Sequence, residues 1–488
     1  MSANSESIAQ RLRTELDRWI GYVQNGEQTA GSAGQVEAKL WQGMLEMGRG
    51  LLQVYFSRAG EREVIYDRLE RPEGSYDYRG PSQRDYVSLF GKVEVERAYY
   101  WNGNGGGLCP LDATLSLPER SYSTCVQERL SEVSVWVPEA QSVTLLERWQ
   151  GLKIPKGSLQ RSLSEQAAWV GGYYAQRAAP VVGEHDSILV ATADGKGIPM
   201  TRADSPPPQA RRTKGQKKTA KKEAIVTALY SVAPYVRSSQ DIIDALLSPT
   251  PERPRASVPR PAPSGKQTFG TLAGKAAAFS QLTHHVTQRH ADQFVHRVAL
   301  SDGSPALQTH LVKDLPDFTL VLDIIHVTEY LWQVATALYG ETSPERSAWM
   351  AQALHALLDN HLDDLLAQLD QPPDPLSTAQ RDTLSHVSAY LRRNRPFMDY
   401  QYYLAQGWPI GTGVVEGACR HLVKDRFEQA GMHWSLLGAQ ALLDLRAVAF
   451  NADWDDFQHF RRQQVHAARY HTPYSDDLPE FLALEAAA

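Results

Sequence analysis

The sequence is poor in cysteine and contains no long apolar run, and both absences narrow the class of protein. Among 488 residues only three are cysteine, at positions 109, 125 and 419, and none of them forms a Cys-x-x-Cys pair. We therefore expect neither a zinc knuckle nor a disulfide framework, and we predict a reducing compartment. The longest apolar stretches, such as Phe318–Ile325, are too short to span a membrane, and the N-terminus lacks a signal-peptide pattern. A cytoplasmic, nucleoid-associated protein without a membrane partner is expected.

The chain also lacks a surplus of positive charge. Lys and Arg number 50 against 56 Asp and Glu, which gives a formal net charge of −6. Taken as an average, this balance argues against a nucleic-acid-binding surface. The distribution argues the other way, because residues 211–222 hold seven basic residues and no acid. The length predicts two to four domains, and 42% hydrophobic residues exclude a wholly disordered chain.

The N-terminal part is predicted to be mostly helical. Apolar residues recur there at three- and four-residue spacing, as in a helix that faces a core: Leu40, Met44, Met47, Leu51 and Val54. Residues 84–100 alternate around Gly91 and predict a short hairpin. Residues 139–170 then read as a helix, a turn with Gly151 and a second helix, as in a helix-turn-helix that presents Arg161 to DNA. Helical hairpins that form only for packing give the same pattern.

From residue 186 the pattern changes to strands and helices of a mixed α/β core. We predict two helices, Leu272–Asp292 and Ser304–Asp314, and five strands: Ser187–Asp194, a second that starts with Gly195–Met200, Glu223–Val232, Val295–Ser301 and Phe318–Asp323. A Pro-rich linker over 249–263 is predicted to be extended. Residues 327–400 are helical in pattern, and a long helix is predicted to begin near Val414.

Three carboxylates lie at positions that suggest a catalytic site, two at the ends of strands and one at the start of a helix. Asp194 ends the first strand, Asp302 follows the fourth, and Glu416 lies in the first turn of the long helix. Grouped carboxylates repel one another unless cations neutralise them, and hard oxygen ligands suit Mg²⁺. Two such ions would activate a nucleophile and stabilise a leaving oxygen in phosphoryl transfer, as expected for an RNase H-like nuclease or transposase. Asp before Gly is also a common turn signal, so each Asp taken singly has a structural interpretation.

Several motifs resemble the Kra-type insertion-sequence transposases, prokaryotic relatives of the Mutator-like group. The resemblance covers most of the chain and rests on these segments: Ala193–Met200, Leu322–Trp332, Pro409–Arg426, Gly431–Ser435 and Gly438–Arg446, with Phe90–Val93, Tyr99–Tyr100 and Pro110–Asp112 upstream. The most specific motifs lie within 409–446. Members of the family often have cysteine pairs between the Tyr-Tyr and Pro-Leu-Asp motifs. This chain has a single cysteine there, Cys109, and departs from that pattern.

The resemblance implies an RNase H-like mixed-sheet core that is interrupted by a helical insertion, together with an Asp-Asp-Glu active site. By position, Asp194 and Glu416 are the first and last catalytic acids, and together with Asp302 they would bind two Mg²⁺ or Mn²⁺ ions. Asp323 is the rival for the second acid. It also begins the separate motif Asp323–His326, in which the histidine orients Asp323, contacts the scissile phosphate or packs at a strand–helix corner.

The expected DNA contacts are basic residues and one tryptophan. Glu416, Arg420 and Lys424 are spaced four residues apart, so an ideal helix places both basic residues on the face of the glutamate, as phosphate contacts or as a solvated ladder. Trp434 stacks on an unpaired base or lies in the core. The basic run supplies the remaining predicted contacts: Arg211, Arg212, Lys214, Lys217 and Lys218.

Together these features predict a DNA transposase that cleaves and transfers strands of an insertion sequence. The alternatives are a stand-alone nuclease and a non-catalytic DNA-binding protein. Its partners would be transposon ends, target DNA and further copies of itself, at least as a dimer. The predicted organisation is an N-terminal helical region (1–75), a DNA-binding region with hairpin and helix-turn-helix (76–180), the first part of the core (181–326) with loops at 204–222 and 249–265, a helical insertion (327–405), the catalytic C-terminal helix (406–450) and a tail without any clear element (451–488).

Overall fold

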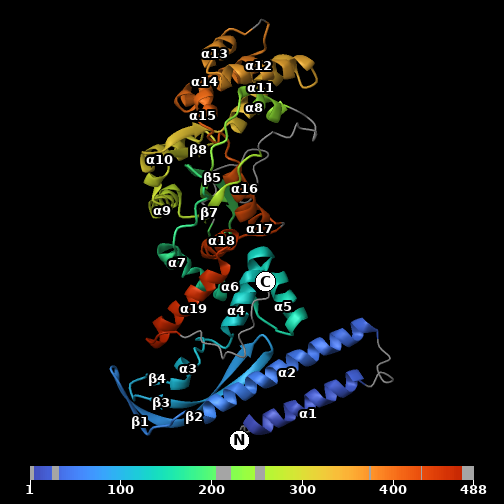
Figure 1. Ribbon diagram of the computed structural model, residues 1–488, viewed down its shortest axis with the longest axis vertical. Helices are drawn as coiled ribbons and strands as arrows, with labels where there is room; N and C mark the ends of the chain where they lie inside the picture. Colours follow the sequence, from blue (N-terminus) through green and yellow to red (C-terminus); the bar gives the residue numbers. More distant parts are fainter. Residues whose placement is uncertain are drawn as a thin grey trace. The chain divides into compact units, whose positions relative to one another are not determined.

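The chain forms two units. The computed structural model describes residues 5–24, 32–204, 221–247, 259–372, 375–429 and 431–474. The first unit combines residues 1–169 with 454–488, and the second comprises residues 170–453 (Figure 1). No helix of the described ranges is long and apolar enough to cross a membrane.

The first unit contains a four-stranded antiparallel sheet, in the order β1-β2-β3-β4, and two groups of helices. Its elements are α1 (Ser5–Gln24), α2 (Ala33–Glu61), β1 (Arg68–Arg71), β2 (Gly74–Ser88), β3 (Gly91–Trp101), β4 (Gly107–Leu108), α3 (Pro110–Thr114), α4 (Thr124–Trp136), α5 (Glu139–Gln150), α6 (Lys156–Ala167) and α19 (Trp454–Tyr470). The expected hairpin is β2–β3, longer than predicted. The expected helix pair is α5–α6, joined at Gly151, whose φ of 69° suits glycine.

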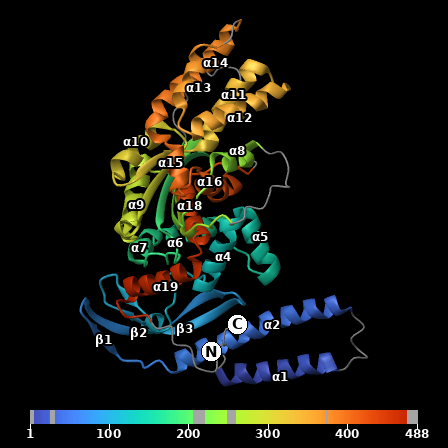
Figure 2. The same ribbon diagram turned by 45° about the horizontal axis from the view of Figure 1, so that its top comes forward.

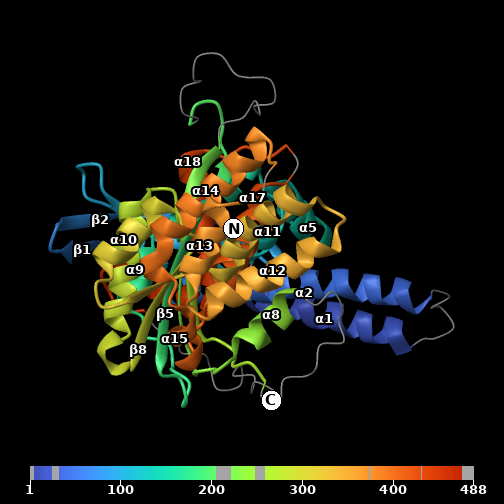
Figure 3. The same cartoon turned by 90° about the horizontal axis from the view of Figure 1, so that it is seen from above.

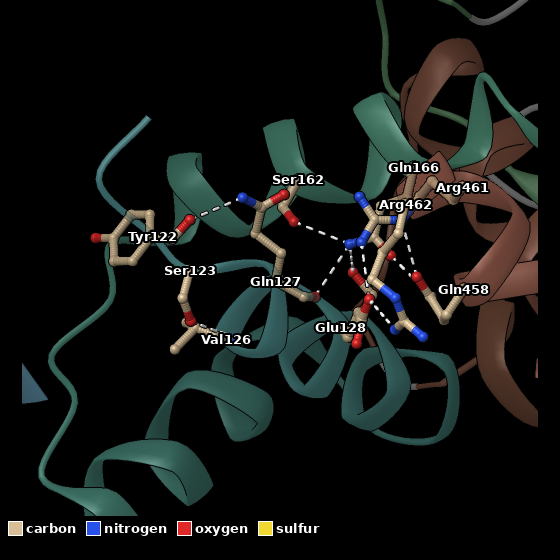
Figure 4. Close-up of polar contacts among 11 residues, drawn as sticks. Tyr122, Ser123, Val126, Gln127, Glu128, Ser162, Gln166, Gln458, Arg461 and Arg462 are labelled. Atoms are coloured by element: carbon tan, nitrogen blue, oxygen red, sulfur yellow. Dashed lines mark hydrogen bonds and ion pairs between the residues drawn. The ribbon is translucent and has the colours of Figure 1, made fainter. Parts of the chain in front are cut away.

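Helix α19 corrects the expectation that residues 451–488 hold no clear element. Its sequence is rich in polar residues, so the apolar spacing from which a helix is usually predicted is weak. Phe457, Gln458 and Arg461 are nevertheless buried. Polar side chains make the contacts (Figure 4). Gln458 donates to the side chain of Gln166 on α6 at 3.0 Å, and Arg461 pairs with Glu128 on α4 at 3.2 Å. Hydrogen bonding therefore replaces the apolar pattern that the sequence analysis looked for.

The second unit is built around a five-stranded mixed sheet in the order β7-β6-β5-β8-β9. The first three strands pair antiparallel, while β8 and β9 run parallel to β5. Its elements are α7 (Val170–Gln176), β5 (Ile188–Pro199), β6 (Lys221–Val232), α8 (Ser239–Leu247), β7 (Ser264–Thr271), α9 (Lys275–Gln288), η2 (Ala291–Gln293), β8 (His296–Ser301), α10 (Pro305–Asp314), β9 (Thr319–Leu322), α11 (Ile324–Tyr339), α12 (Pro344–Leu358), α13 (Leu362–Asp370), α14 (Thr378–Asn394), η3 (Arg395–Phe397), α15 (Tyr400–Ala405), α16 (Gly413–Ala418), η4 (Cys419–Lys424), α17 (Asp425–Phe427) and α18 (Leu436–Phe450).

Two strand predictions need correction. No turn divides the first predicted strand from the second, because β5 runs unbroken from Ile188 to Pro199. Gly195 and Gly197 make room for side chains of β6 instead: a Cβ at Gly195 would lie 2.5 Å from the Glu223 side chain. Strand β7 was missed, because its buried residues include polar Gln267 and Thr268. The last two residues of the basic run, at 221–222, belong to β6 rather than to a loop.

Helices cover both faces of this sheet. Odd-numbered residues of β5, such as Leu189 and Ala191, pack against α9 and α10. Even-numbered residues, such as Ile188 and Val190, share a core with α8 and with α11–α15. Figures 2 and 3 show α9 and α10 together on one side of the strands, with α16 and α18 (Figure 2) or α11–α14 (Figure 3) on the other. The second face carries the candidate site.

Candidate active site

Asp194 lies in β5, and Asp302 directly follows the neighbouring strand β8. In the parallel pair β5–β8, Thr192 is opposite Leu300, so the two aspartates, each two residues further on, fall at the same level. Neighbouring strands are about 4.8 Å apart. Side chains alternate between faces, and both aspartates share the parity of the residues that face α11–α15. The register therefore brings together two residues that are more than one hundred positions apart in the sequence.

The Asp302 carboxyl is held in a partly buried turn. Its Oδ1 accepts a hydrogen bond from the Ser304 backbone N–H at 2.9 Å. Burial raises the pKa of Asp302, and the charge of Asp194 raises it further. Helix α14 fixes the same turn, since the Tyr390 hydroxyl donates to the Asp302 carbonyl at 3.3 Å. A carboxyl that resists ionisation beside another carboxylate is suited to a cation.

Glu416 is linked to Asp323 through one hydroxyl. Thr412, which precedes α16, contacts Glu416 Oε1 at 2.8 Å and Asp323 Oδ2 at 2.5 Å. The Asp323 side chain is fully buried and caps α11, where its Oδ1 accepts the Ile325 N–H at 2.9 Å. With His326 also bound to Oδ2, the Asp323 carboxylate has three hydrogen-bond partners inside the protein.

His326 forms an ion pair with the buried carboxylate. Its Nδ1 lies 2.7 Å from Asp323 Oδ2, and its side chain is 31% exposed. The hydrogen bond to Asp323 raises the pKa of His326 to about 9, so the ring is an imidazolium at neutral pH. The charge of Asp302 acts in the same direction, which places the cationic ring near the carboxylates of the site.

Cys419 is a residue of the site that the sequence analysis did not single out. Its buried thiol hydrogen-bonds to Asp194, and burial together with the charges of Asp194 and Glu416 raises its pKa strongly. The thiol therefore stays protonated and lies beside the first and last predicted acids. Thr412 was missed as well. Its one sequence signal was its place four residues before Glu416, where a side chain can meet the glutamate on one helix face.

A π-helical turn, η4, spans Cys419–Lys424 and so interrupts the single long helix that was predicted to begin near Val414. Arg420 lies 3.9 Å from Asp425 in this turn, and the shared face of Glu416, Arg420 and Lys424 stays a prediction. The buried guanidinium of Arg446 donates to the Leu422 carbonyl at 2.7 Å and to the His421 carbonyl, and so supports this turn from α18. π-Helical turns often occur at functional sites.

Two sets of residues offer metal ligands. Ligand atoms of Asp323, His326 and Glu416 all lie within 4.8 Å of one another. In that set, however, the Asp323 carboxylate is buried and already bound to His326 and Thr412. Asp194, Asp302 and Glu416 are only partly buried and offer hard oxygen ligands, but among the described residues only the first set meets this distance criterion.

The predicted DNA-contacting residues have different surroundings. Arg420 and Lys424 are exposed on η4, and Arg161 is exposed on α6 of the other unit. Trp434 is only 8% exposed, donates its indole N–H to the Phe427 carbonyl and packs against Arg426. The structure thus corrects the base-stacking interpretation in favour of a core residue. The predicted contacts of the basic run lie outside the described residues: Arg211, Arg212, Lys214, Lys217 and Lys218.

Comparison with known proteins adds little to this geometry. No protein-family model matches the chain, and no curated protein matches it. Among solved structures, a Drosophila P element transposase strand transfer complex aligns over 73% of this chain and 83% of that chain, with 8% sequence identity and a TM-score of 0.24. A match of this quality carries no argument about fold or function.

Proposed function

We propose that the protein is a metal-dependent DNA transposase of the Asp-Asp-Glu type, with an RNase H-like core in the second unit. The observation that supports the proposal is the register of β5 and β8: continued by two residues beyond the last printed pair, it puts Asp194 level with Asp302, and the charge of Asp194 acts on Asp302. Glu416 belongs to α16, which packs against β5 and β6. The mixed sheet, with α11–α15 inserted between β9 and α16, also fits the interrupted core that the sequence resemblance implies.

The proposed chemistry has two in-line steps. In the first, water loses a proton as its oxygen bonds to phosphorus, the P–O3′ bond breaks, and the departing 3′-oxygen takes up a proton. In the second, the freed 3′-hydroxyl loses its proton as its oxygen attacks phosphorus in target DNA, and the target 3′-oxygen leaves and takes up a proton. Two divalent cations, Mg²⁺ or Mn²⁺, held by Asp194, Asp302 and Glu416 would polarise the attacking and leaving oxygens.

We assign different roles to Asp302 and Asp323. Asp302 is the second metal ligand, because it is level with Asp194 and half-buried. Asp323 is a positioning residue, because its buried carboxylate holds His326 and Thr412. The imidazolium of His326 then faces the developing negative charge of the phosphoryl group. Positioning by Asp323 keeps this ring protonated and fixed in orientation.

A strand-cleavage and strand-transfer assay tests the proposal. The substrate is DNA that carries the short inverted repeats flanking the gene, with Mg²⁺ present. Asp194→Asn and Asp302→Asn are expected to lose at least about 10³-fold in rate and to lose Mg²⁺ binding in titration calorimetry, whereas Asp323→Asn loses about 10- to 100-fold and keeps it. Asp302→Asn with normal Mg²⁺ binding, together with Asp323→Asn without it, would reverse the assignment.

The same assay separates the alternatives. Cleavage without joining identifies a nuclease, and DNA binding without cleavage under any metal identifies a non-catalytic protein. Strand transfer requires two ends to be held together, so we also propose a complex of at least two copies on DNA. Light scattering with and without end DNA measures that stoichiometry, and a monomeric complex that still joins ends would contradict it.

A further inference from the structure

A cavity lies in the same unit as the candidate active site. It measures about 430 Å³ and is bounded by the end of β6 with the segment that follows, by residues 260–263, and by the turn from Gly407 to Val414. The turn approaches the β6 side closely. Tyr235 N donates to the Gly407 carbonyl at 2.9 Å, and a Cβ at Gly407 would lie 2.5 Å from Tyr235 N. A larger residue at position 407 would clash with the backbone of Tyr235, so the close packing that forms this wall of the cavity requires glycine.

Two guanidinium groups face this cavity. Arg237 and Arg260 both line it, and its described lining contains no Asp or Glu. Arg237 is half-buried and donates to two backbone carbonyls, those of Tyr235 at 3.0 Å and of Trp408. Burial and the nearby charge of Arg260 lower the pKa of Arg237 to about 10. The acid that partly offsets them, Asp241, is bound to Ser238 and is not part of the wall. Two cations held together without a carboxylate favour an anionic ligand.

The rest of the wall is aromatic and apolar. Tyr235, which is half-buried, lines the cavity together with proline, alanine and glycine residues from 261–263 and 407–413, and the nearly buried Tyr230 contributes to the wall from the core. Tyrosine rings stack on planar bases, and arginine pairs with phosphate through its planar fork. The volume falls in the usual range for small-ligand sites. We propose that this cavity binds a nucleotide unit, with its phosphate at Arg237 and Arg260 and its base against the tyrosine and proline wall.

The cavity shares a segment with the catalytic residues. Gly411, Gly413 and Val414 line it, and Glu416 follows in the same helix. On the catalytic side, a Cβ at Gly411 would lie 3.5 Å from Asp323 Oδ1. The turn therefore separates the nucleotide cavity from the carboxylates. This inference rests on the proposed function in one respect. A DNA strand that is cleaved in the proposed active site, next to Glu416, would place one of its neighbouring nucleotides in the cavity.

Binding without metal tests the inference. The full-length protein is titrated in EDTA into a labelled single-stranded oligonucleotide, and fluorescence anisotropy gives the affinity. Arg260→Gln and Arg237→Gln are expected to weaken binding about 10-fold and to reduce the slope against salt by about one. Arg260 is exposed, so we expect its variant to fold and to remain informative if Arg237→Gln is unstable. Arg381→Gln, an exposed arginine on α14 outside the cavity, is the matched control.

Competitors distinguish the source of the nucleotide. A mononucleotide that displaces the oligonucleotide from wild type but not from Arg260→Gln indicates a free nucleotide, and displacement only by longer strands indicates the DNA strand; both support the site. Equal affinities of Arg260→Gln and Arg381→Gln would overturn it, as would displacement by inorganic phosphate as effective as that by nucleotide. Because cleavage is not measured, this test can fail while the proposed function holds. The proposed function fails instead if Asp194→Asn cleaves end DNA as fast as wild type.

Discussion

At the residue scale, the hydroxyl of Thr412 connects two acids that the sequence places far apart. A hydroxyl carries one proton, so Thr412 donates to only one of Asp323 and Glu416 at a time, and its contact with the other is then weak. A cation on Glu416 would remove this conflict, because Glu416 would then need no donor and Thr412 could donate to Asp323. The side chain therefore couples the orientation of Glu416 to the Asp323–His326 pair.

We expect Thr412→Val, which keeps the shape and removes the hydroxyl, to lower the rate of strand cleavage by about 10- to 100-fold. Thr412→Ser keeps the hydroxyl and should recover most of the rate. Cleavage of end DNA at saturating Mg²⁺ measures the effect, and a thermal unfolding curve confirms that the fold is kept. A Thr412→Val enzyme as active as wild type would mean that the hydroxyl does not position Glu416.

His285 gives the second unit a dependence on pH. Its ring is 2% exposed and stacks on Phe269 at 4.2 Å, and burial lowers the pKa of His285 to about 4. Above about pH 6.5 the histidine is neutral in both folded and unfolded chains. Below that value the unfolded chain binds a proton at this histidine, whereas the folded chain does not. The free energy of unfolding therefore falls as the pH falls towards 4.

Between pH 7 and pH 4 we expect the free energy of unfolding of wild type to fall by up to about 3 kcal/mol more than that of His285→Phe. Phenylalanine keeps the stack on Phe269 and does not titrate. Urea unfolding at each pH measures the difference. His433→Phe, at an exposed position, controls for the loss of a histidine. Parallel pH profiles for wild type and His285→Phe would contradict this explanation.

At the scale of elements, α19 packs against α4 and α6 of the first unit through polar side chains. Glu128 on α4 accepts from Arg461 at 3.2 Å and from Arg462 at 2.9 Å, and the Arg461 side chain is only 6% exposed (Figure 4). Gln166 on α6 links the network to Ser131, so three helices share it. A buried guanidinium without its carboxylate is costly, so Glu128 is central to the docking of α19.

Glu128→Ala is expected to destabilise the first unit by about 3 kcal/mol, because it leaves Arg461 buried without its carboxylate. Glu132→Ala is the matched control. It lies on the same helix, and its partner Arg129 is 63% exposed, so a change below about 0.5 kcal/mol is expected. Thermal or urea unfolding that follows this unit measures both. Equal effects of the two substitutions would show that the buried pair does not hold α19.

At the scale of the whole molecule, charge is distributed unevenly. The net charge is −6, yet one twelve-residue run holds seven basic residues. The carboxylates of Asp194, Asp302 and Glu416 add negative charge that bound cations would offset. Lys424 remains exposed after the π-helical turn, close in sequence to Glu416. For the proposed DNA binding, net charge is therefore a poor guide, and local charge is expected to decide the affinity.

Lys424→Ala is expected to weaken binding of end DNA and to reduce the slope of log affinity against log salt by about one. Lys313→Ala removes the same charge from an exposed site on α10, which covers the other face of the sheet, and should change neither quantity. Anisotropy titrations at several salt concentrations measure both variants. Identical slopes for Lys424→Ala and wild type would exclude a phosphate contact at this position.

Much of the fold could be predicted from local patterns, and the errors have physical causes. Apolar strands such as β6 and β8 and helices such as α10 begin and end near the predicted residues, because apolar periodicity reports burial. Gly195 was misread as a turn, since glycine also serves the close approach of strands. Strand β7 and helix α19 were missed, because polar residues with hydrogen-bond partners can be buried without an apolar pattern.

The sequence by itself determined which residues are candidates for chemistry, because carboxylates at strand ends and in the first turn of a helix stand out from their local context. It did not determine which of them meet. The pairing of β5 with β8 puts Asp194 level with Asp302, and Asp323 is buried against Thr412 and His326, which is the basis of the different roles proposed for Asp302 and Asp323. These relations depend on contacts between segments far apart in the chain, and neither local propensity nor periodicity encodes such contacts directly.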